Sequence, residues 1–327
     1  MNFEKKKLIK VKGDASFREF YRKKLKSKSS IIVYAKKEKI KNLLIYDAVN
    51  RLLIQNRILA PKLYKENFNE NYIEVKDLGT NTIFDIFKKN KKNYLTILKK
   101  IILLLKKIQK IKKSKTKNFK NQYYKIPTYT KNLLFIEAKL FCDWYVPTCV
   151  SNQKIRSVNK ELTKKIKFLL SKIKQKNDIF VHRDFHVSNL MIFEKRYGVI
   201  DTQDAVIGNK AYDLASLIDD VRFKTSNQLK GQVYEYYLNL NKANLDVKKF
   251  KNDFDILSVL RNLKIIGIFT RLAKRDRKYN YLKFIPYTWK LIELRTNDNH
   301  LLKDLKTLLD KNFSKKIRNR KWKLKQH

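Results

Sequence analysis

Ten consecutive residues, VHRDFHVSNL at positions 181–190, place the strongest constraint on how this 327-residue chain can fold. Asp184 and Asn189 lie in this stretch with four residues between them, and a second acid, Asp201, follows an isoleucine shortly afterwards. Apolar residues on both sides of a polar turn at 194–196 predict two short strands. Folding this hairpin back on itself brings Asn189 near Asp201, with Asp184 just upstream. Three oxygen-bearing side chains are therefore expected at one end of the hairpin.

Side chains of this kind suit phosphoryl transfer. Magnesium prefers oxygen ligands and keeps several waters, so one carboxylate and one amide oxygen are enough beside the phosphates of ATP. A separate carboxylate has to face the acceptor hydroxyl and take or orient its proton. We therefore assign Asn189 and Asp201 to the metal and Asp184 to catalysis. The alternatives are a chance motif whose acids cap turns, or zinc on His182 and His186; the strand-rich flanks and the missing glutamate argue against zinc.

The composition predicts a folded protein with an extreme charge. Hydrophobic residues make up 43% of the chain, and 77 Lys and Arg against 30 Asp and Glu give a formal net charge of +47. Such a charge suits a nucleic acid or another anionic surface. However, the lysines are spread over every expected helix and do not form one stripe. This distribution favours a compositional bias as the explanation of the charge. We therefore do not expect a nucleic-acid partner, although a cationic surface attracts ATP.

Nothing in the sequence indicates export or a membrane segment. Cys142 and Cys149 are the only cysteines, without a disulfide framework or a metal-ligand pattern. Residues 1–12 are basic and lack the apolar core of a signal peptide. The longest apolar run, at 101–105, is far shorter than the ~20 residues that a membrane helix needs. A cytoplasmic protein with reduced thiols and no membrane contact is the simplest expectation.

The chain is expected to divide into two parts of an α+β fold. Residues 1–78 predict a small β-rich lobe that binds nucleotide, and residues 79–327 a larger, mainly helical lobe with the catalytic loop and acceptor site. The segment 13–18 lies between two strand-like stretches, and its Gly-Asp turn can point backbone N–H groups at an anion; an ordinary hairpin turn is the alternative. A strand that ends at Lys36 offers a lysine for the α- and β-phosphates. The segment around Asp77 breaks the pattern, as a hinge whose backbone groups bind adenine would.

The helical part contains fewer informative residues. Trp144 lies in an aromatic-rich stretch and either stacks on a sugar or packs in the core. Asp204 can face the metal region or the acceptor. Asp213 is placed to cap a helix or brace the catalytic loop.

These segments resemble the aminoglycoside phosphotransferase/choline kinase superfamily, and within it the anomeric N-acetylmuramate/N-acetylglucosamine kinase branch. The resemblance runs nearly from end to end. Its segments are GDASFREFYR at 13–22, VKDLGT at 75–80, LFCDWYVP at 140–147, VHRDFHVSNL at 181–190, GVIDTQDAVIGNKAYDLASLIDD at 198–220 and RNLKIIGIFTRLAKRDRKYNYL at 261–282. The catalytic-loop motif is typical of the whole kinase-like superfamily, whereas the first and last segments indicate the sugar-kinase branch.

The resemblance implies a two-lobed protein-kinase-like fold that uses ATP and Mg²⁺ to phosphorylate the anomeric hydroxyl of an N-acetyl amino sugar in cell-wall recycling. It implies that Asp184 is the catalytic base and that Asn189 and Asp201 bind the metal. The nucleotide-binding candidates are Gly13, Asp14, Ser16, Arg18, Lys36 and Asp77. The sugar-binding candidates are Asp204, Trp144, Arg261 and Arg271; the two arginines either reach a sugar carboxylate or brace core carboxylates.

Two departures from the family pattern stand out. Thr202 and Gln203 follow the metal aspartate where kinases have Phe-Gly, and the strand lysine with its helix glutamate is not clearly matched. The alternative functions are a phosphotransferase for an aminoglycoside or choline-like acceptor, a nucleic-acid-binding protein and an inactive pseudokinase. A polycationic aminoglycoside calls for an acidic cleft, and this chain has few acids. A pseudokinase would lack one of the three catalytic or metal residues, and all three are present.

Overall fold

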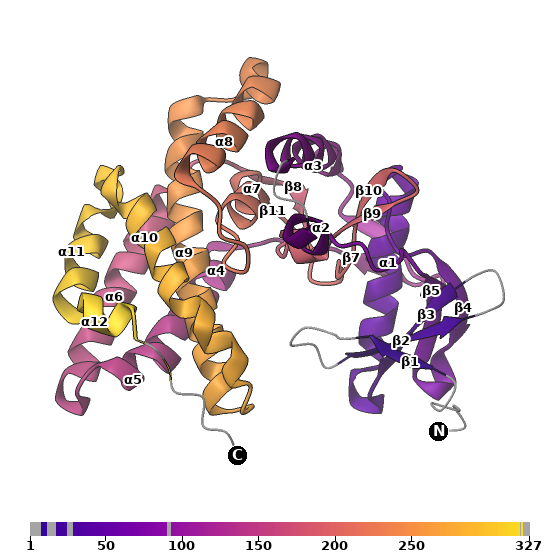
Figure 1. The fold of residues 1–327 in the computed structure, drawn as a ribbon, viewed down its shortest axis with the longest axis horizontal. Helices are drawn as coiled ribbons and strands as arrows, with labels where there is room; N and C mark the ends of the chain where they lie inside the picture. Colours follow the sequence, from indigo (N-terminus) through magenta and orange to yellow (C-terminus); the bar gives the residue numbers. More distant parts are fainter. Residues whose placement is uncertain (1–7, 12–17, 25–28, 90–92, 321, 323–327) are drawn as a thin grey trace. The chain divides into compact units, whose positions relative to one another are not determined.

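The computed structural model describes residues 8–11, 18–24, 29–89, 93–320 and 322, so the nucleotide-binding candidates Gly13, Asp14 and Ser16 lie outside the described residues. The chain forms two compact units (Figure 1). The first unit comprises residues 1–127 and 179–207, and the second comprises residues 128–178 and 208–327. The lobe boundary expected at residue 78 stays a prediction; the first unit also includes residues 79–127 and the hairpin within 179–207.

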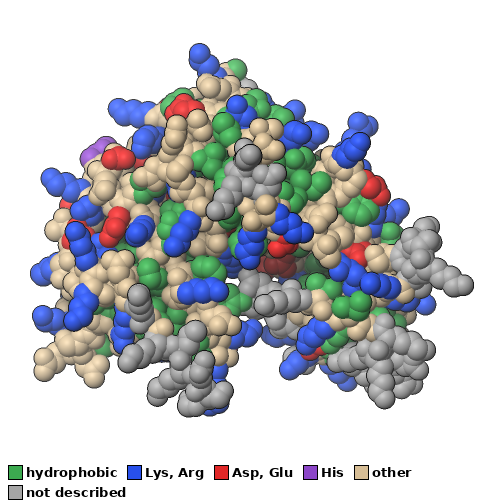
Figure 2. Space-filling view, viewed as in Figure 1, with side chains coloured by type: hydrophobic (Ala, Val, Ile, Leu, Met, Phe, Trp, Pro, Cys, Tyr) green, Lys and Arg blue, Asp and Glu red, His purple; other side chains and the backbone are tan. Residues whose placement is uncertain are grey.

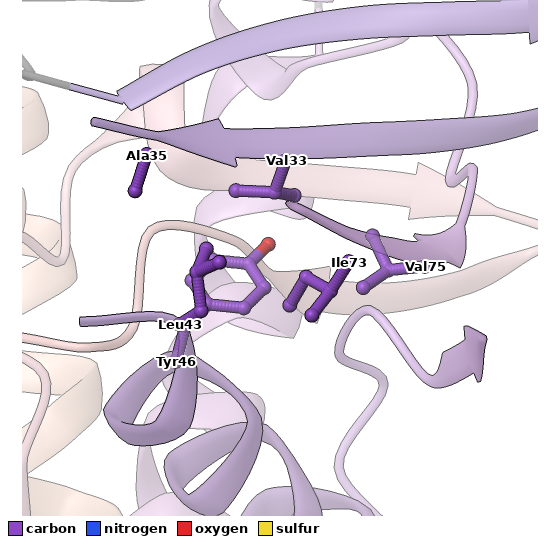
Figure 3. Packing of buried hydrophobic residues seen from close by; sticks show 6 residues of the cluster. All are labelled: Val33, Ala35, Leu43, Tyr46, Ile73 and Val75. Carbon is purple, nitrogen blue, oxygen red and sulfur yellow. The ribbon is translucent and has the colours of Figure 1, made fainter. Parts of the chain in front are cut away.

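An antiparallel five-stranded sheet opens the first unit, with the strand order β1-β2-β3-β5-β4 (Figure 1). Its strands are β1 (Ile9–Val11), β2 (Arg18–Lys24), β3 (Ser29–Ala35), β4 (Leu63–Asn67) and β5 (Tyr72–Lys76). Alternate residues of β3 and β5 point to one face and meet the helix α1 (Lys41–Gln55) there, since side chains of a strand alternate between its faces. This core cluster, drawn in Figure 3, consists of Val33, Ala35, Leu43, Tyr46, Ile73 and Val75.

The first unit contains further helices and strands, among them the hairpin at 190–199. They are α2 (Ile83–Lys89), α3 (Tyr94–Ile108), β6 (Lys115–Lys117), β7 (Tyr123–Lys125), β9 (Leu190–Phe193) and β10 (Arg196–Val199). The hairpin expected from the sequence is present, because β9 and β10 pair antiparallel with Val199 opposite Leu190. Its two turn residues, Glu194 and Lys195, have φ angles of 49° and 59°. Positive φ at both turn positions matches the twist of the flanking strands.

Two strands carry the chain between the units and pair with each other: β8 (Asn177–Val181) and β11 (Val206–Asn209). The second unit is mainly helical. Its helices are α4 (Lys131–Leu140), a π-helical turn (Phe141–Tyr145), α5 (Val146–Cys149), α6 (Asn152–Lys172), α7 (Ala211–Ile218), α8 (Asn227–Asn241), α9 (Val247–Lys274), α10 (Ile285–Asn297), α11 (Lys303–Asn312) and α12 (Lys315–Arg318).

Helix α9 forms the centre of the second unit and packs against α4, α7 and α10. Gly267 permits the contact with α4, because a Cβ atom there would lie 2.3 Å from the carbonyl carbon of Leu140. The sheet followed by a mainly helical part gives the α+β class that the sequence predicts.

The surface in Figure 2 shows Lys and Arg side chains scattered over the face in view, without a single dominant stripe. Among the described residues, no helix combines the length and the apolar character that a membrane crossing requires.

Candidate active site

The loop from Asp184 to Asn189 closes on itself through backbone and side-chain hydrogen bonds. The carbonyl oxygen of Asp184 accepts from the His186 N–H at 3.0 Å and from Asn189 Nδ2 at 3.1 Å. The N–H of Asn189 donates to the carbonyl of His186 at 2.9 Å. These hydrogen bonds account for the spacing of four residues between Asp184 and Asn189. Because a carbonyl oxygen only accepts, Asn189 turns its Nδ2 towards it, and the amide oxygen Oδ1 is the atom available to a cation.

The segment before Asp201 is held against this loop. The N–H of Ile200 donates to the carbonyl of Asn189 at 3.0 Å, and His182 Nε2 lies 3.0 Å from the carbonyl of Ile200. His182 is fully buried, and its Nε2 must carry the proton in this bond. This contact indicates a structural role for His182. Arg183 and Asp201 adopt left-handed backbone with φ of 73° and 60°, a strained conformation that concentrates at functional sites.

The carboxylate of Asp201 lies in a charged environment. Its Oδ1 is 3.1 Å from Nη2 of Arg18, and its side chain is 34% exposed while that of Arg18 is 3% exposed. Burial raises the pKa of Asp201 to about 6, with Arg18 opposing this effect and the charges of Asp184 and Asp204 adding to it. The three carboxylates therefore lie near enough to repel one another, an arrangement that a divalent cation relieves.

The donor set fits magnesium better than zinc. Within the described ranges, no group of three or more His, Cys, Asp or Glu side chains could hold a metal ion. Magnesium needs only one or two protein oxygens, because waters and phosphates complete its octahedron. Asn189 Oδ1 and the partly exposed carboxylate of Asp201 meet that need. Their metal role and the catalytic role of Asp184 stay predictions.

Thr202, Gln203 and Asp204 occupy the stretch where kinases have Phe-Gly. Thr202 is buried and donates to Oδ1 of Asn50 at 2.6 Å. Gln203 Nε2 donates to the carboxylate of Asp204 at 2.7 Å, and Arg183 Nη1 donates to the Asp204 carbonyl at 3.0 Å. The side chain of Asp204 is exposed, and its backbone is hydrogen-bonded to Arg183 next to the loop at 184–189, so it remains a candidate for the acceptor.

The described nucleotide candidates occupy different environments. Arg18 is buried against Asp201, whereas Lys36 follows β3 and is exposed. The Asp77 carboxylate already accepts from Arg22 Nε at 2.6 Å, from the Ser29 hydroxyl at 2.7 Å and from the Gly79 N–H at 2.8 Å.

Burial by itself would raise the pKa of Asp77, but these hydrogen bonds lower it. The side chain thus fixes the turn at Gly79, where φ is +81°. An adenine contact at this hinge would use its backbone.

Three sugar candidates lie in the second unit. Arg261 is buried and its Nη1 lies 3.5 Å from the carbonyl of Asp219, which favours bracing over substrate contact. Trp144 is half-buried in the π-helical turn, and Arg271 is half-buried near the end of α9. Their substrate roles stay predictions.

Sequence reasoning missed two residues of α1 that lie next to the site. Tyr46 packs under the Arg18 guanidinium, with 5.6 Å from its ring centroid to Cζ, and Asn50 holds Thr202. The available signal was a polar residue, Asn50, among the mainly apolar buried residues of this helix.

Comparisons with known proteins indicate the class of protein that this chain resembles. The model of the phosphotransferase enzyme family matches residues 90–247, which include the catalytic candidate Asp184 and the metal candidates. A choline/ethanolamine kinase family protein from Mesorhizobium loti has a similar structure, with a TM-score of 0.61, 9% identity and coverage of 92% of each chain. The ternary complex of APH(2'')-IIa with streptomycin and ATP has a TM-score of 0.56, 14% identity and coverage of 89% of this chain and 99% of that one. The fold is therefore protein-kinase-like and two-lobed.

The expected resemblance to the aminoglycoside phosphotransferase/choline kinase superfamily is thereby confirmed: residues 90–247 match the model of the phosphotransferase enzyme family. A more specific likeness comes from sequence. The N-acetylmuramate/N-acetylglucosamine kinase of Pseudomonas putida is 28% identical over 284 residues, which cover 85% of this chain and 80% of that protein.

Proposed function

We propose that this protein is an ATP-dependent sugar kinase that phosphorylates the anomeric hydroxyl of N-acetylmuramate or N-acetylglucosamine, in the cytoplasm, during recycling of cell-wall sugars. One observation carries the kinase chemistry: the loop that closes at Asn189 and the strand that ends before Asp201 are hydrogen-bonded to each other, with Asp184 at the start of the loop. The name of the P. putida relative supports the choice of acceptor.

Each residue has a defined task in this proposal. The carboxylate of Asp184 orients the acceptor hydroxyl and takes its proton. An anomeric hydroxyl is more acidic than an ordinary alcohol, so a carboxylate with ordinary basicity is sufficient. Asn189 Oδ1 and the Asp201 carboxylate would hold Mg²⁺, which, when bound, neutralises charge on the nucleotide phosphates. The product is a sugar 1-phosphate.

A panel of acceptors tests the proposal directly. The purified protein is incubated with ATP and Mg²⁺ and, in separate reactions, N-acetylmuramate, N-acetylglucosamine, unacetylated sugars, aminoglycosides and choline. Release of ADP is measured, and ³¹P–¹H correlation NMR locates the phosphate. We expect ADP with the N-acetyl sugars and phosphate on C1.

Other outcomes reject defined parts of the proposal. Phosphate on another hydroxyl would reject the anomeric assignment and keep the kinase. Turnover only with aminoglycosides or choline would reject the sugar. No ADP with any acceptor would reject kinase activity.

A further inference from the structure

We propose that Arg18 takes the place of the kinase strand lysine and binds the α- and β-phosphates of the nucleotide, and that Tyr46 and Asn50 position it. This inference rests on the proposed kinase function and names the cationic side chain that binds the phosphates of the nucleotide. It also accounts for the missing lysine–glutamate pair.

The usual positions for that pair are poorly suited here. In protein kinases a lysine of the third strand holds the phosphates and a glutamate of the following helix holds the lysine. Lys36, directly after β3, is exposed and precedes a 3-10 turn at Lys37–Lys39. Helix α1 contains no glutamate, and its one acid, Asp47, pairs with Arg51 at 2.8 Å.

Arg18 supplies a cation from the neighbouring strand. It lies directly opposite Ala35 in the β2–β3 ladder, one residue from Lys36. Its side chain, however, is buried and reaches Asp201, one of the two metal candidates, at 3.1 Å. A guanidinium has five N–H groups in a planar fork, so it can hold a carboxylate and a phosphate at the same time. Arg18 is therefore placed beside the metal site with a group suited to phosphate.

Tyr46 holds the guanidinium from the helix side. Its ring centroid lies 5.6 Å from Arg18 Cζ, within the range of a cation–π contact. Figure 3 shows the side chain directed from α1 towards the strands. Burial raises the pKa of Tyr46 to about 12, with the charge of Arg18 opposing this effect and that of Asp201 adding to it. The ring is therefore a neutral surface under the cation, where a kinase would have a glutamate.

Asn50 connects this support to the metal strand. Its Oδ1 accepts from the hydroxyl of Thr202 at 2.6 Å, and Thr202 directly follows Asp201. Both side chains are buried. The helix that carries Tyr46 is thereby fixed to the acid that Arg18 contacts. Arg18 is held on one side by the ring of Tyr46 and on the other by the carboxylate of Asp201. The hydrogen bond between Thr202 and Asn50 joins the two segments that carry these groups.

The test compares binding of ADP and adenosine by isothermal titration calorimetry, since the ratio of the two affinities isolates the contribution of the phosphates and needs no acceptor sugar. In wild type we expect ADP to bind more tightly. R18Q should reduce this preference about 10- to 100-fold, because hydrogen bonds to charged groups are worth about 1.5–3 kcal/mol, and should leave adenosine affinity unchanged. K23Q is the matched control: Lys23 is on the same strand, its side chain is 41% exposed and its Nζ lies 3.4 Å from Glu74.

Tyr46 has its own pair of variants. Y46L removes the ring and should lower the preference for ADP, whereas Y46F keeps the ring and should restore it. If R18Q does not fold, the variants Y46L, Y46F and K36A test the inference in its place. Retention of the ADP preference in R18Q or Y46L, or its loss in K36A, would overturn the inference. Equal affinity of wild type for ADP and adenosine would instead count against the kinase function itself.

Discussion

Thr202 donates its hydroxyl hydrogen to Oδ1 of Asn50 at 2.6 Å, across 152 residues of sequence. Both residues are buried, Thr202 at 0% exposure and Asn50 at 2%. The bond joins α1, which packs on the N-terminal sheet, to the strand end that presents Asp201. It therefore connects the core of the first unit with its candidate metal site.

Replacing Thr202 by valine should destabilise the first unit. T202V keeps the shape of the side chain but leaves the buried Asn50 oxygen without its donor, at a cost of about 1–3 kcal/mol. Urea denaturation followed by circular dichroism measures the loss. T202S keeps a hydroxyl and should recover most of the stability. Equal stability of wild type and T202V would show that the bond contributes nothing.

The substitution D184N should separate catalysis from nucleotide binding. The amide has nearly the same shape but cannot accept the acceptor proton, so kcat should fall by about 10²- to 10⁴-fold, the usual contribution of a general base. Affinity for ADP, measured by calorimetry, should stay within about twofold, because Asp184 is assigned to the acceptor. Rates come from an ADP-release assay at saturating sugar. An unchanged kcat would remove Asp184 from the catalytic role.

The sequence predicted what depends on local pattern. Apolar residues on both sides of a polar turn are enough to define the β9–β10 hairpin, so the approach of Asn189 to the segment before Asp201 was foreseeable. The pairing of Arg18 with Asp201 was not, because 183 residues separate them and no local pattern records the contact. The same holds for Asn50 and Thr202. Lys36 is a candidate because it follows a strand, but a strand pattern does not show which cation points inward.

Arg261 illustrates a related limit. A buried arginine and a substrate-binding arginine look alike in sequence, whereas the contact with the Asp219 carbonyl favours bracing for Arg261. Tertiary context decides such cases.

Gly267 should not tolerate alanine. The added methyl group would meet the backbone of Leu140 and Phe141, where α4 ends, at 2.3–2.6 Å, and backbone cannot move aside as a flexible side chain can. G267A should therefore destabilise the second unit by about 1–3 kcal/mol or more, as overpacking does. Thermal and urea unfolding measure the change.

Gly231 provides the matched control for this prediction. It also lies within a helix, α8, but a Cβ atom there meets nothing within 4 Å. G231A should stabilise the protein by about 0.5–1 kcal/mol, because alanine has the higher helix propensity. Similar effects of the two substitutions would contradict the close approach of α9 to α4.

The stability of the second unit should depend on pH through the ionisation of Asp219. This buried carboxylate accepts from Arg295 at 2.8 and 2.9 Å and from Ser258 at 2.6 Å, and Lys230 lies 3.3 Å away. Burial alone would raise its pKa, but the charges of Arg295 and Lys230 outweigh burial and lower it from 3.8 to about 2.

The folded state therefore binds the Asp219 proton more weakly than the unfolded state does. Its contribution to stability is complete above pH 3.8, the unfolded value, and is lost as the pH falls towards 2. The size of this component is on the order of 2 kcal/mol.

The variant D219N isolates this component. At pH 7 it should be less stable than wild type by about 3–5 kcal/mol, since it leaves buried cations without their carboxylate. Urea unfolding from pH 7 down to the lowest pH at which both proteins fold should show the difference shrinking, because wild-type Asp219 becomes neutral as well. D304N is the control, since Asp304 is an exposed acid paired with Lys165, a pair that solvent screens. A difference between wild type and D219N that stays constant with pH would mean that Asp219 is not held ionised by its cations.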